Sequence, residues 1–323
     1  MIERIRQYFI LGDSQIRLYL LAMITGLLAG GVIILFRLLI EHSQANLFPS
    51  GEIEGFSSLH WTWILALPIV GGLIIGLLFN NLKPDQRSIG IVHIIERLSY
   101  HEGRLPWHNA LLQFIGASLA LISGHSVGRE GPSVHLGAAS GSLLASNLEL
   151  PNNSIRILVA SGSAAAIAAS FNTPIAGVIF AMEVIMMEYH IATFIPIILA
   201  SVSGAVVSRL VFGDNQFFGF ITTEMQSLWE LPYIIFLGIL LGFLATLFIR
   251  SLHFFSNLLS NSPFWQRTSL AGILVGLGGL IMPDVMGINH NITNTAHLTE
   301  LAIASLLTLL ILKLVLSTAC IGL

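Results

Sequence analysis

Arg129 and Glu130 are the two residues whose type and setting could do chemistry in this sequence. They are the only formal charges between residues 105 and 148, and long apolar runs flank them on both sides. An ionisable side chain is expensive to place in such a setting, so it marks a candidate functional site by default. Glu130 is followed by Gly131 and Pro132, and a proline is well suited to the first position of a helix.

A carboxylate at a helix start can act as a gate for anions. Free backbone N–H groups at that end of a helix favour an anion, through hydrogen bonds and the helix dipole. The glycines Gly128 and Gly131 would let bare backbone approach a ligand. Glu130 can occupy the anion position itself and leave it on protonation, so the gate would respond to pH and to competing anions. The alternatives are a charge in an exposed loop and a simple helix cap, and spacing alone does not choose between them.

The elements that must position these residues are membrane helices. Of the 323 residues, 54 % are hydrophobic and 10 % are charged, against about 25 % charged in soluble domains. The net charge is −3 and the mean hydropathy is +0.83. This composition excludes a cytosolic enzyme, a nucleic-acid binder and a disordered chain, and the lone Cys320 excludes an internal disulfide framework. We therefore expect an all-α polytopic membrane protein.

Uncharged stretches give the candidate spans, which need about 20 mostly apolar residues. They are 18–36, 55–82, 105–128, 131–148, 157–182, 189–208, 231–249, 268–283 and 301–312.

Loop charge gives the orientation. The N-terminal segment carries Arg4, Arg6 and Arg17, the loop 43–60 has no Lys or Arg, and the loop 83–104 is basic. The positive-inside rule places the N-terminus and the basic loop in the cytoplasm.

Three polar interruptions divide the region 105–182 into short helices. They are SGHSVGREGP, NLELPNNS and SFNTP, and Pro174 in the last one suits a helix start capped by Asn172 or Thr173. Helices that start and stop inside a membrane are expected where backbone lines an enclosed cavity.

A weak internal repeat is also present. Residues 25–42 resemble 241–255, and 66–78 resemble 270–282 in the same order. This fits two homologous halves, although spans rich in Gly and Leu also look alike by chance.

Two motifs carry a resemblance to a known family. The strings GREGPSVHLGAA (128–139) and ASGSAAAIAASFNTPIAGVIFAMEV (160–184) resemble the CLC family of chloride channels and chloride/proton antiporters. The resemblance implies one transmembrane domain, 1–323, made of two inverted halves of tilted, partly spanning helices, about 16–212 and an incomplete 228–323. It implies a homodimer with one anion path per subunit and Glu130 as the gating glutamate.

The resemblance also implies the anion-binding residues. The stretch RSIGIVHIIE (87–96) aligns with an anion-binding motif of the family, with Val92 where the family has proline. Ser88 lies one place away from the family's serine, and a helix cap is an equally good reading of it. The implied anion-binding set is Ser88, Gly90, Ile91, Gly128, Arg129, Gly131 and Pro132.

The proton path departs from the antiporter pattern. Val184 aligns with the internal proton-handling glutamate of the family's antiporters, and valine cannot carry a proton. Glu183 lies one residue before it, and one step along a helix turns a side chain by about 100°. Glu183 is therefore no simple substitute, and a buried structural acid with local hydrogen bonds is its alternative reading. This favours a channel-like protein.

The sequence ends at Leu323, before the Gly-x-Phe-x-Pro helix start and the central tyrosine that the family carries. We therefore expect a C-terminally truncated member without a cytoplasmic regulatory domain.

The expected function is passive or proton-linked chloride transport in the cell (inner) membrane. A chloride/proton antiporter and a non-transporting fragment are the alternatives. The expected partners are chloride or a similar small anion, protons in the antiporter alternative, the lipid bilayer and a second copy of the chain. We expect no enzyme activity, cofactor or nucleic-acid partner, and no metal site, since the histidines of HEGRLPWH (101–108) are wrongly spaced for zinc.

Overall fold

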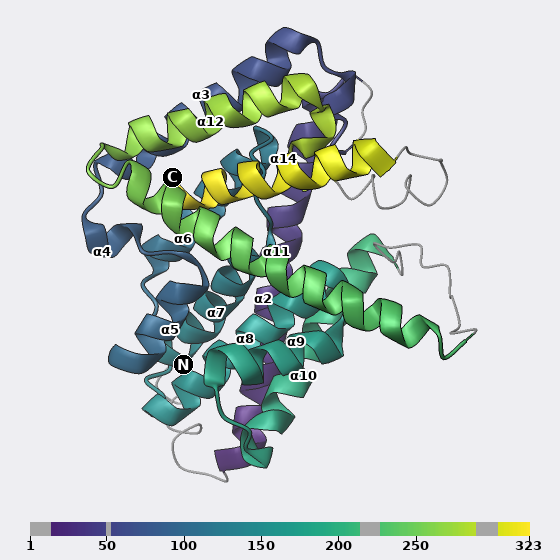
Figure 1. Ribbon diagram of the computed structural model, residues 1–323. Helices are drawn as coiled ribbons and strands as arrows, with labels where there is room; N and C mark the ends of the chain where they lie inside the picture. Colours follow the sequence, from purple (N-terminus) through teal and green to yellow (C-terminus); the bar gives the residue numbers. More distant parts are fainter. Residues whose placement is uncertain (1–13, 50–52, 214–226, 289–302) are drawn as a thin grey trace. The chain divides into compact units, whose positions relative to one another are not determined.

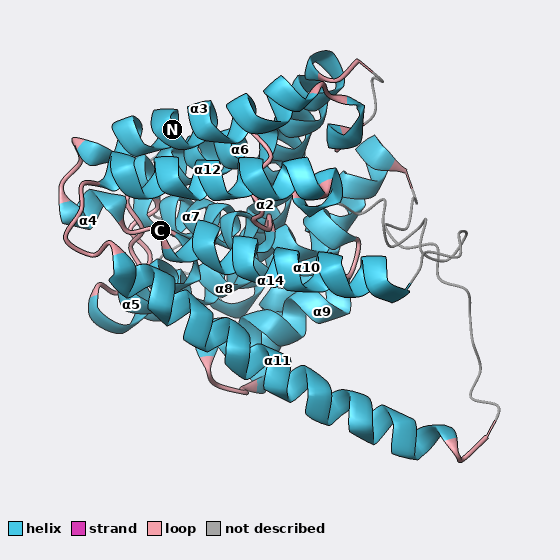
Figure 2. Ribbon diagram, turned by 45° about the horizontal axis from the view of Figure 1, so that its top comes forward, coloured by secondary structure: helices cyan, strands magenta, loops and turns pink. Residues whose placement is uncertain are grey.

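The computed structural model describes residues 14–49, 53–213, 227–288 and 303–323. Across these ranges the regular structure is helical and no strand occurs (Figures 1 and 2). The all-α expectation is therefore confirmed. Arg4 and Arg6, on which part of the orientation argument rests, lie outside the described residues.

Twelve α-helices are assigned within the described residues. Their bounds are α2 Ser14–Leu47, α3 Trp61–Asn80, α4 Pro84–Arg87, α5 Gly90–Tyr100, α6 Trp107–Ile122, α7 Glu130–Asn147, α8 Asn152–Phe171, α9 Pro174–Phe180, α10 Ile191–Phe212, α11 Glu230–Leu258, α12 Phe264–Ile281 and α14 Ile303–Gly322. A π-helical segment, Ala181–Met186, continues α9, and two 3₁₀ turns lie at Phe56–Ser58 and Pro283–Val285.

Within the described residues, six helices are long and apolar enough to cross a membrane. They are Gln15–Leu47, Trp61–Asn80, Asn152–Phe171, Ile191–Phe212, Glu230–Leu258 and Ala304–Gly322. The first runs well past the uncharged stretch 18–36, because Arg37 and Glu41 form an ion pair one helical turn apart. Two opposite charges four residues apart are compatible with a continuous helix, so α2 continues past Arg37, where the uncharged stretch ends.

The three predicted interruptions are confirmed. α6 ends at Ile122 before α7 begins, a short turn separates α7 from α8, and α8 ends at Phe171 before α9. Two details of the prediction are wrong. Pro132 is the third residue of α7, not the first, which the helix tolerates because its first four N–H groups have no intrahelical partner. Thr173 occupies the N-cap position of α9 without a side-chain hydrogen bond, and Pro174 follows as the first residue.

The chain forms two compact units, each built from three segments. Unit 1 comprises Met1–His42, Leu82–Ser118 and Arg129–Gln216, and unit 2 comprises Ser43–Asn81, Leu119–Gly128 and Phe217–Leu323. These boundaries do not follow the predicted halves, since two segments of the expected first half belong to unit 2. The inverted repeat itself stays a prediction.

Unit 1 is built around α8, since 83 % of an 18-residue apolar stretch of this helix is buried. Its packing depends on backbone contact at glycines. A Cβ at Gly137 in α7 would overlap the backbone oxygen of Gly162 in α8, and one at Gly141 would overlap that of Leu158. Small residues spaced in this way let membrane helices approach closely. The middle of α7 therefore packs closely on the buried helix α8.

Unit 2 contains the stretches 66–78 and 270–282, which lie in α3 and α12 and pack on one another (Figures 1 and 2). A Cβ at Gly272 would overlap the backbone oxygen of Pro68, and one at Gly72 would overlap that of Thr268. Two helices that resemble each other in sequence thus share one close interface.

Candidate functional site

Glu130 is the first residue of the 18-residue helix α7. Its side chain is exposed, and the first turn around it contains Gly131 and Pro132. The N–H group of Ser133 donates to the backbone oxygen of Arg129 at 3.0 Å, so the helical ladder starts there. The N–H groups of Glu130 and Gly131 precede this ladder and have no acceptor within the helix. A carboxylate and free amides thus meet at one helix start, as the motif predicted.

Gly131 is not required by packing. A Cβ built on it would meet no atom within 4 Å. This fits a glycine that keeps backbone open to a small ligand. Gly128, at the beginning of the motif, is exposed and is the last residue of a unit 2 segment, so the motif starts in unit 2 and continues in unit 1.

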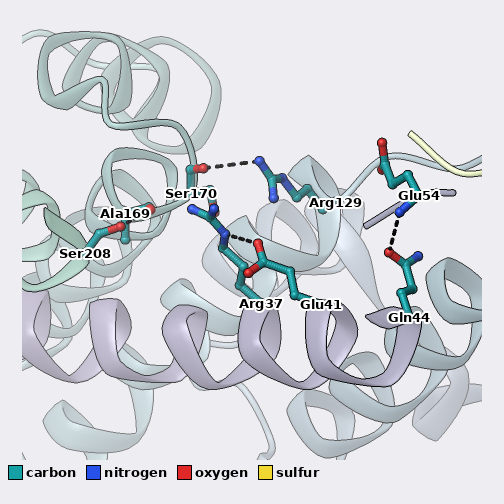
Figure 3. Close-up of polar contacts among 8 residues, drawn as sticks. All are labelled: Arg37, Glu41, Gln44, Glu54, Arg129, Ala169, Ser170 and Ser208. Carbon is teal, nitrogen blue, oxygen red and sulfur yellow. Dashed lines mark hydrogen bonds and ion pairs between the residues drawn. The ribbon is translucent and has the colours of Figure 1, made fainter. Parts of the chain in front are cut away.

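The Arg129 side chain turns into unit 1. It is buried, and its Nη2 donates to the backbone oxygen of Ser170 at 3.4 Å (Figure 3). Its guanidinium lies 5.4 Å from the centre of the Phe171 ring. Both partners belong to the last turn of α8, where carbonyl groups lack intrahelical donors and attract a cation. The guanidinium therefore connects the start of α7 to the end of α8.

The corner after α8 has two further polar contacts. Asn172 adopts a left-handed conformation with φ 57° and accepts a hydrogen bond from Nε of Arg209 at 2.6 Å. The Ser208 hydroxyl donates to the backbone oxygen of Ala169 at 2.7 Å (Figure 3). This corner corresponds to the SFNTP interruption, and α10 fixes it from one side.

The predicted anion motif 88–91 lies at the start of α5. Ser88 is extended, and its backbone oxygen accepts a hydrogen bond from Nδ2 of Asn109 at 2.7 Å. Ser88 is the C-cap residue of α4, and Ile89 is the N-cap residue of α5, so the reading of Ser88 as a helix cap fits the end of α4. Gly90 has φ +80° with open space around it, a conformation that L side chains rarely adopt. Ile91 packs against the core of unit 1.

Two buried histidines link α5 to α7. Nδ1 of His93 lies 3.0 Å from Nε2 of His135, and Nε of Arg97 donates to Nε2 of His93 at 3.1 Å. The histidines are 42 residues apart, so no local spacing rule could have found the pair. The helices that start at Gly90 and Glu130 are thereby joined inside unit 1.

Glu183 and Val184 lie in the π-helical segment, a kind of insertion that is frequent at functional sites. Glu183 is exposed, whereas Val184 is half-buried and packs against the core of unit 1. The two side chains therefore have different surroundings, and the reading of Glu183 as a buried structural acid is wrong.

Unit 2 contains a charged residue in an apolar helix. Nζ of Lys313 in α14 donates to the backbone oxygens of Val285, at 3.1 Å, and Gly287. A cation inside a membrane protein needs such partners, so these two carbonyl groups give Lys313 a structural explanation. A separate contact in the same unit is the Glu54 N–H, which donates to the Gln44 side chain at 3.3 Å (Figure 3).

The sequence matches a family profile described as voltage gated chloride channel over residues 71–323. It is 30 % identical over 253 residues to a putative chloride channel protein, ClcB-like, of Ralstonia nicotianae, covering 76 % of this chain and 58 % of that protein. It is 28 % identical over 280 residues to the voltage-gated ClC-type chloride channel ClcB of Escherichia coli, covering 84 % and 66 %. The chain thus spans less than two thirds of the length of both relatives.

Solved structures share the fold. A slow cyanobacterial Cl⁻/H⁺ antiporter superposes with a TM-score of 0.81 at 22 % identity, covering 95 % of this chain and 73 % of that one. A CLC-type fluoride/proton antiporter superposes with a TM-score of 0.78 at 21 % identity, covering 95 % and 76 %.

Proposed function

The chain belongs to the voltage gated chloride channel family, and on that premise we propose that it carries chloride passively across a membrane, with Glu130 as its gate. It is an integral membrane protein, and the part of the chain that the structure describes contains six helices long and apolar enough to span a membrane. The observation that supports the gate most strongly is the position of Glu130 as the first residue of α7, beside amides that the helix leaves unpaired.

In the proposed mechanism, chloride loses water against backbone N–H groups at helix starts. The start of α7 supplies one such group, and the start of α5 at Gly90 supplies another. Several weak N–H contacts suit conduction, because an anion must bind well enough to enter and weakly enough to leave. The Glu130 carboxylate competes with chloride for the amides of α7. Protonation removes its charge and lets the anion through, so flux should rise as pH falls.

The antiporter alternative concerns proton coupling. Its support is that two solved structures with this fold are antiporters by their descriptions. Val184, which packs its apolar side chain on the core of unit 1, favours passive transport because it provides no proton-carrying group. Exposed Glu183 is the nearest acid in the chain and does not share the surroundings of Val184.

We also propose a homodimer in the inner cell membrane, with the N-terminus in the cytoplasm. The four Lys and Arg residues of the segment 83–104, which contains α4 and α5, support this orientation by the positive-inside rule. The expected ligand is chloride or a similar small anion.

Flux measurements on the 323-residue chain in liposomes test the proposal. A chloride gradient should drive chloride out when a potassium ionophore balances charge, with no uphill proton movement. Proton movement against its gradient would instead establish the antiporter. Absence of any anion flux, in a protein that remains folded and reconstituted, would support the non-transporting fragment and contradict the proposal.

A further inference from the structure

A chain of three side chains joins α5 to α7 in unit 1. Nε of Arg97 donates to Nε2 of His93, and Nδ1 of His93 lies 3.0 Å from Nε2 of His135. His93 is 2 % exposed and His135 is fully buried. No other described hydrogen bond joins these two helices through their side chains.

The guanidinium fixes the tautomers along this chain. Because an arginine N–H can only donate, Nε2 of His93 must accept and carries no proton. A neutral His93 then carries its proton on Nδ1 and donates it to Nε2 of His135. The remaining ring nitrogen of His135, Nδ1, is buried without a hydrogen-bond partner among the described residues. His93 is therefore the one polar contact that orients the His135 ring.

His93 stays neutral at neutral pH, so the hydrogen bonds from Arg97 to His93 and from His93 to His135 keep these directions. α5 is not among the helices apolar and long enough to cross a membrane, and burial, reinforced by the Arg97 guanidinium, lowers the pKa of His93 to about 4. Glu96 opposes this shift, while His101 and His108 add to it slightly. The imidazole is thus neutral over the range in which anion flux would be measured.

The link lies close to both candidate helix starts. His93 is three residues after Gly90, about 4.5 Å along the helix axis, and His135 is five residues after Glu130, about 7.5 Å along it, at 1.5 Å per residue. The hydrogen bond between His93 and His135 limits how far the start of α5 can slide or rotate against the start of α7.

We propose that His93 and His135 are positioning residues, which set the spacing between the amides at the start of α5 and those at the start of α7. The inference rests on the proposed function. It predicts that the link affects which anion passes and how Glu130 responds to pH, in addition to any effect on stability.

The test compares variants that break the link with variants that keep it. His93→Leu and His135→Leu remove the hydrogen bond. His93→Gln can still accept from Arg97 through Oε1 and donate to His135 through Nε2, and His135→Gln can still accept. The readouts are the chloride-to-bromide flux ratio and the pH of half-maximal flux, measured on the full chain in liposomes.

Ser142→Ala is the matched control. The Ser142 hydroxyl is fully buried on the same helix, donates to the backbone oxygen of Gly103 at 2.8 Å and accepts from the Leu105 N–H at 2.7 Å. Its loss therefore also breaks a buried link of α7, but 12 residues from Glu130 rather than five. The variant measures what a general loss of stability does to flux.

Each leucine variant should change the chloride-to-bromide flux ratio, or the proton concentration at which flux is half-maximal, by roughly threefold to tenfold. This is the range expected for the loss of one internal hydrogen bond. The double variant should add little, because either change alone breaks the link. The glutamine variants and Ser142→Ala should keep both wild-type values. If the leucine variants only lose thermal stability, as Ser142→Ala does, the two histidines have no positioning role.

Glu130→Gln in the same assay separates this inference from the proposed function. If that variant changes the pH profile and the leucine variants do not, the positioning role alone is contradicted. If Glu130→Gln keeps the wild-type pH profile, or the wild-type chain carries no anion, the proposed function fails and the inference fails with it.

Discussion

The guanidinium of Arg129 donates to the backbone oxygen of Ser170 at 3.4 Å, so the residue before Glu130 is tied to the C-terminal end of α8. The same guanidinium lies over the Phe171 ring. The resemblance implies that Arg129 belongs to the anion-binding residues, and that role stays a prediction. The structure gives this side chain buried partners within unit 1. Its contribution to an anion path would then come from fixing the start of α7.

Arg129→Gln should therefore change gating. Loss of the hydrogen bond and of the ring contact removes about 1–2 kcal/mol of interaction, which frees the first turn of α7. The pH of half-maximal chloride flux should move, and thermal stability in detergent should fall by a few degrees. Flux of the full chain in liposomes at several pH values measures the first effect.

Arg209→Gln is the control for that variant. Arg209 holds the same corner through Asn172 but belongs to α10. It should lower thermal stability by a similar amount and keep the wild-type pH profile. Equal shifts of the pH profile in both variants would mean that the corner, and not the link to Glu130, controls the response.

Gly137→Ala should destabilise the chain strongly. Its Cβ would overlap the backbone oxygen of Gly162, which cannot move aside as a flexible side chain would. Forcing such a contact costs about 1–3 kcal/mol. The melting temperature in detergent should fall by several degrees.

Gly31→Ala offers the comparison, because a Cβ there meets no atom within 4 Å. In the interior of helix α2 an alanine is favoured over glycine by roughly 0.5–1 kcal/mol, so stability should stay equal or rise. A Gly137→Ala protein as stable as Gly31→Ala would show that α7 and α8 do not pack as described.

Gly90→Ala should reduce chloride flux. An alanine at φ +80° costs about 1–2 kcal/mol, and relief of that strain would turn the first amides of α5. Gly213→Ala is the control, because Gly213 also has a positive φ, +73°, and open space around it, at the end of α10. Both variants should lose stability, but only Gly90→Ala should change the chloride-to-bromide flux ratio. A changed chloride-to-bromide flux ratio in both variants would show that the start of α5 has no special role in the anion path.

Val184→Glu should introduce proton coupling if the internal acid is what this chain lacks. The new carboxyl would lie half-buried against the core of unit 1, where a proton-carrying group becomes possible. A chloride gradient should then move protons uphill, measured with a pH-sensitive dye in the liposome lumen. Val184→Gln is polar and cannot titrate, so it should stay uncoupled. Proton movement in the glutamine variant would trace the effect to polarity or leakage.

Much of the helical plan could be predicted from local sequence. The break before α7, the start of α9 at Pro174 and the position of Glu130 at a helix start all depend on residues within a few positions of one another. Pro132 was placed two positions too early in the helix, because proline is tolerated throughout the first turn and not only at its first residue.

The contacts that tie the candidate site together could not be predicted in this way. His93 and His135 are 42 residues apart, and Arg129 and Ser170 are 41 apart. Such pairs depend on how α5, α7 and α8 pack, and sequence periodicity does not encode that packing. The π-helical segment was missed as well, since an insertion of one residue in a helix leaves the apolar pattern of 174–186 nearly unchanged.

The most direct test of the central claim is the pH dependence of chloride flux in Glu130→Gln, with Glu183→Gln as the control acid. Wild-type flux should rise as pH falls, because protonation removes the competing charge. Glu130→Gln cannot ionise, so its flux should be high and should lose the wild-type dependence on pH, while Glu183→Gln follows the wild type. A Glu130→Gln protein whose flux still rises with acid as the wild type's does would show that Glu130 is not the gate.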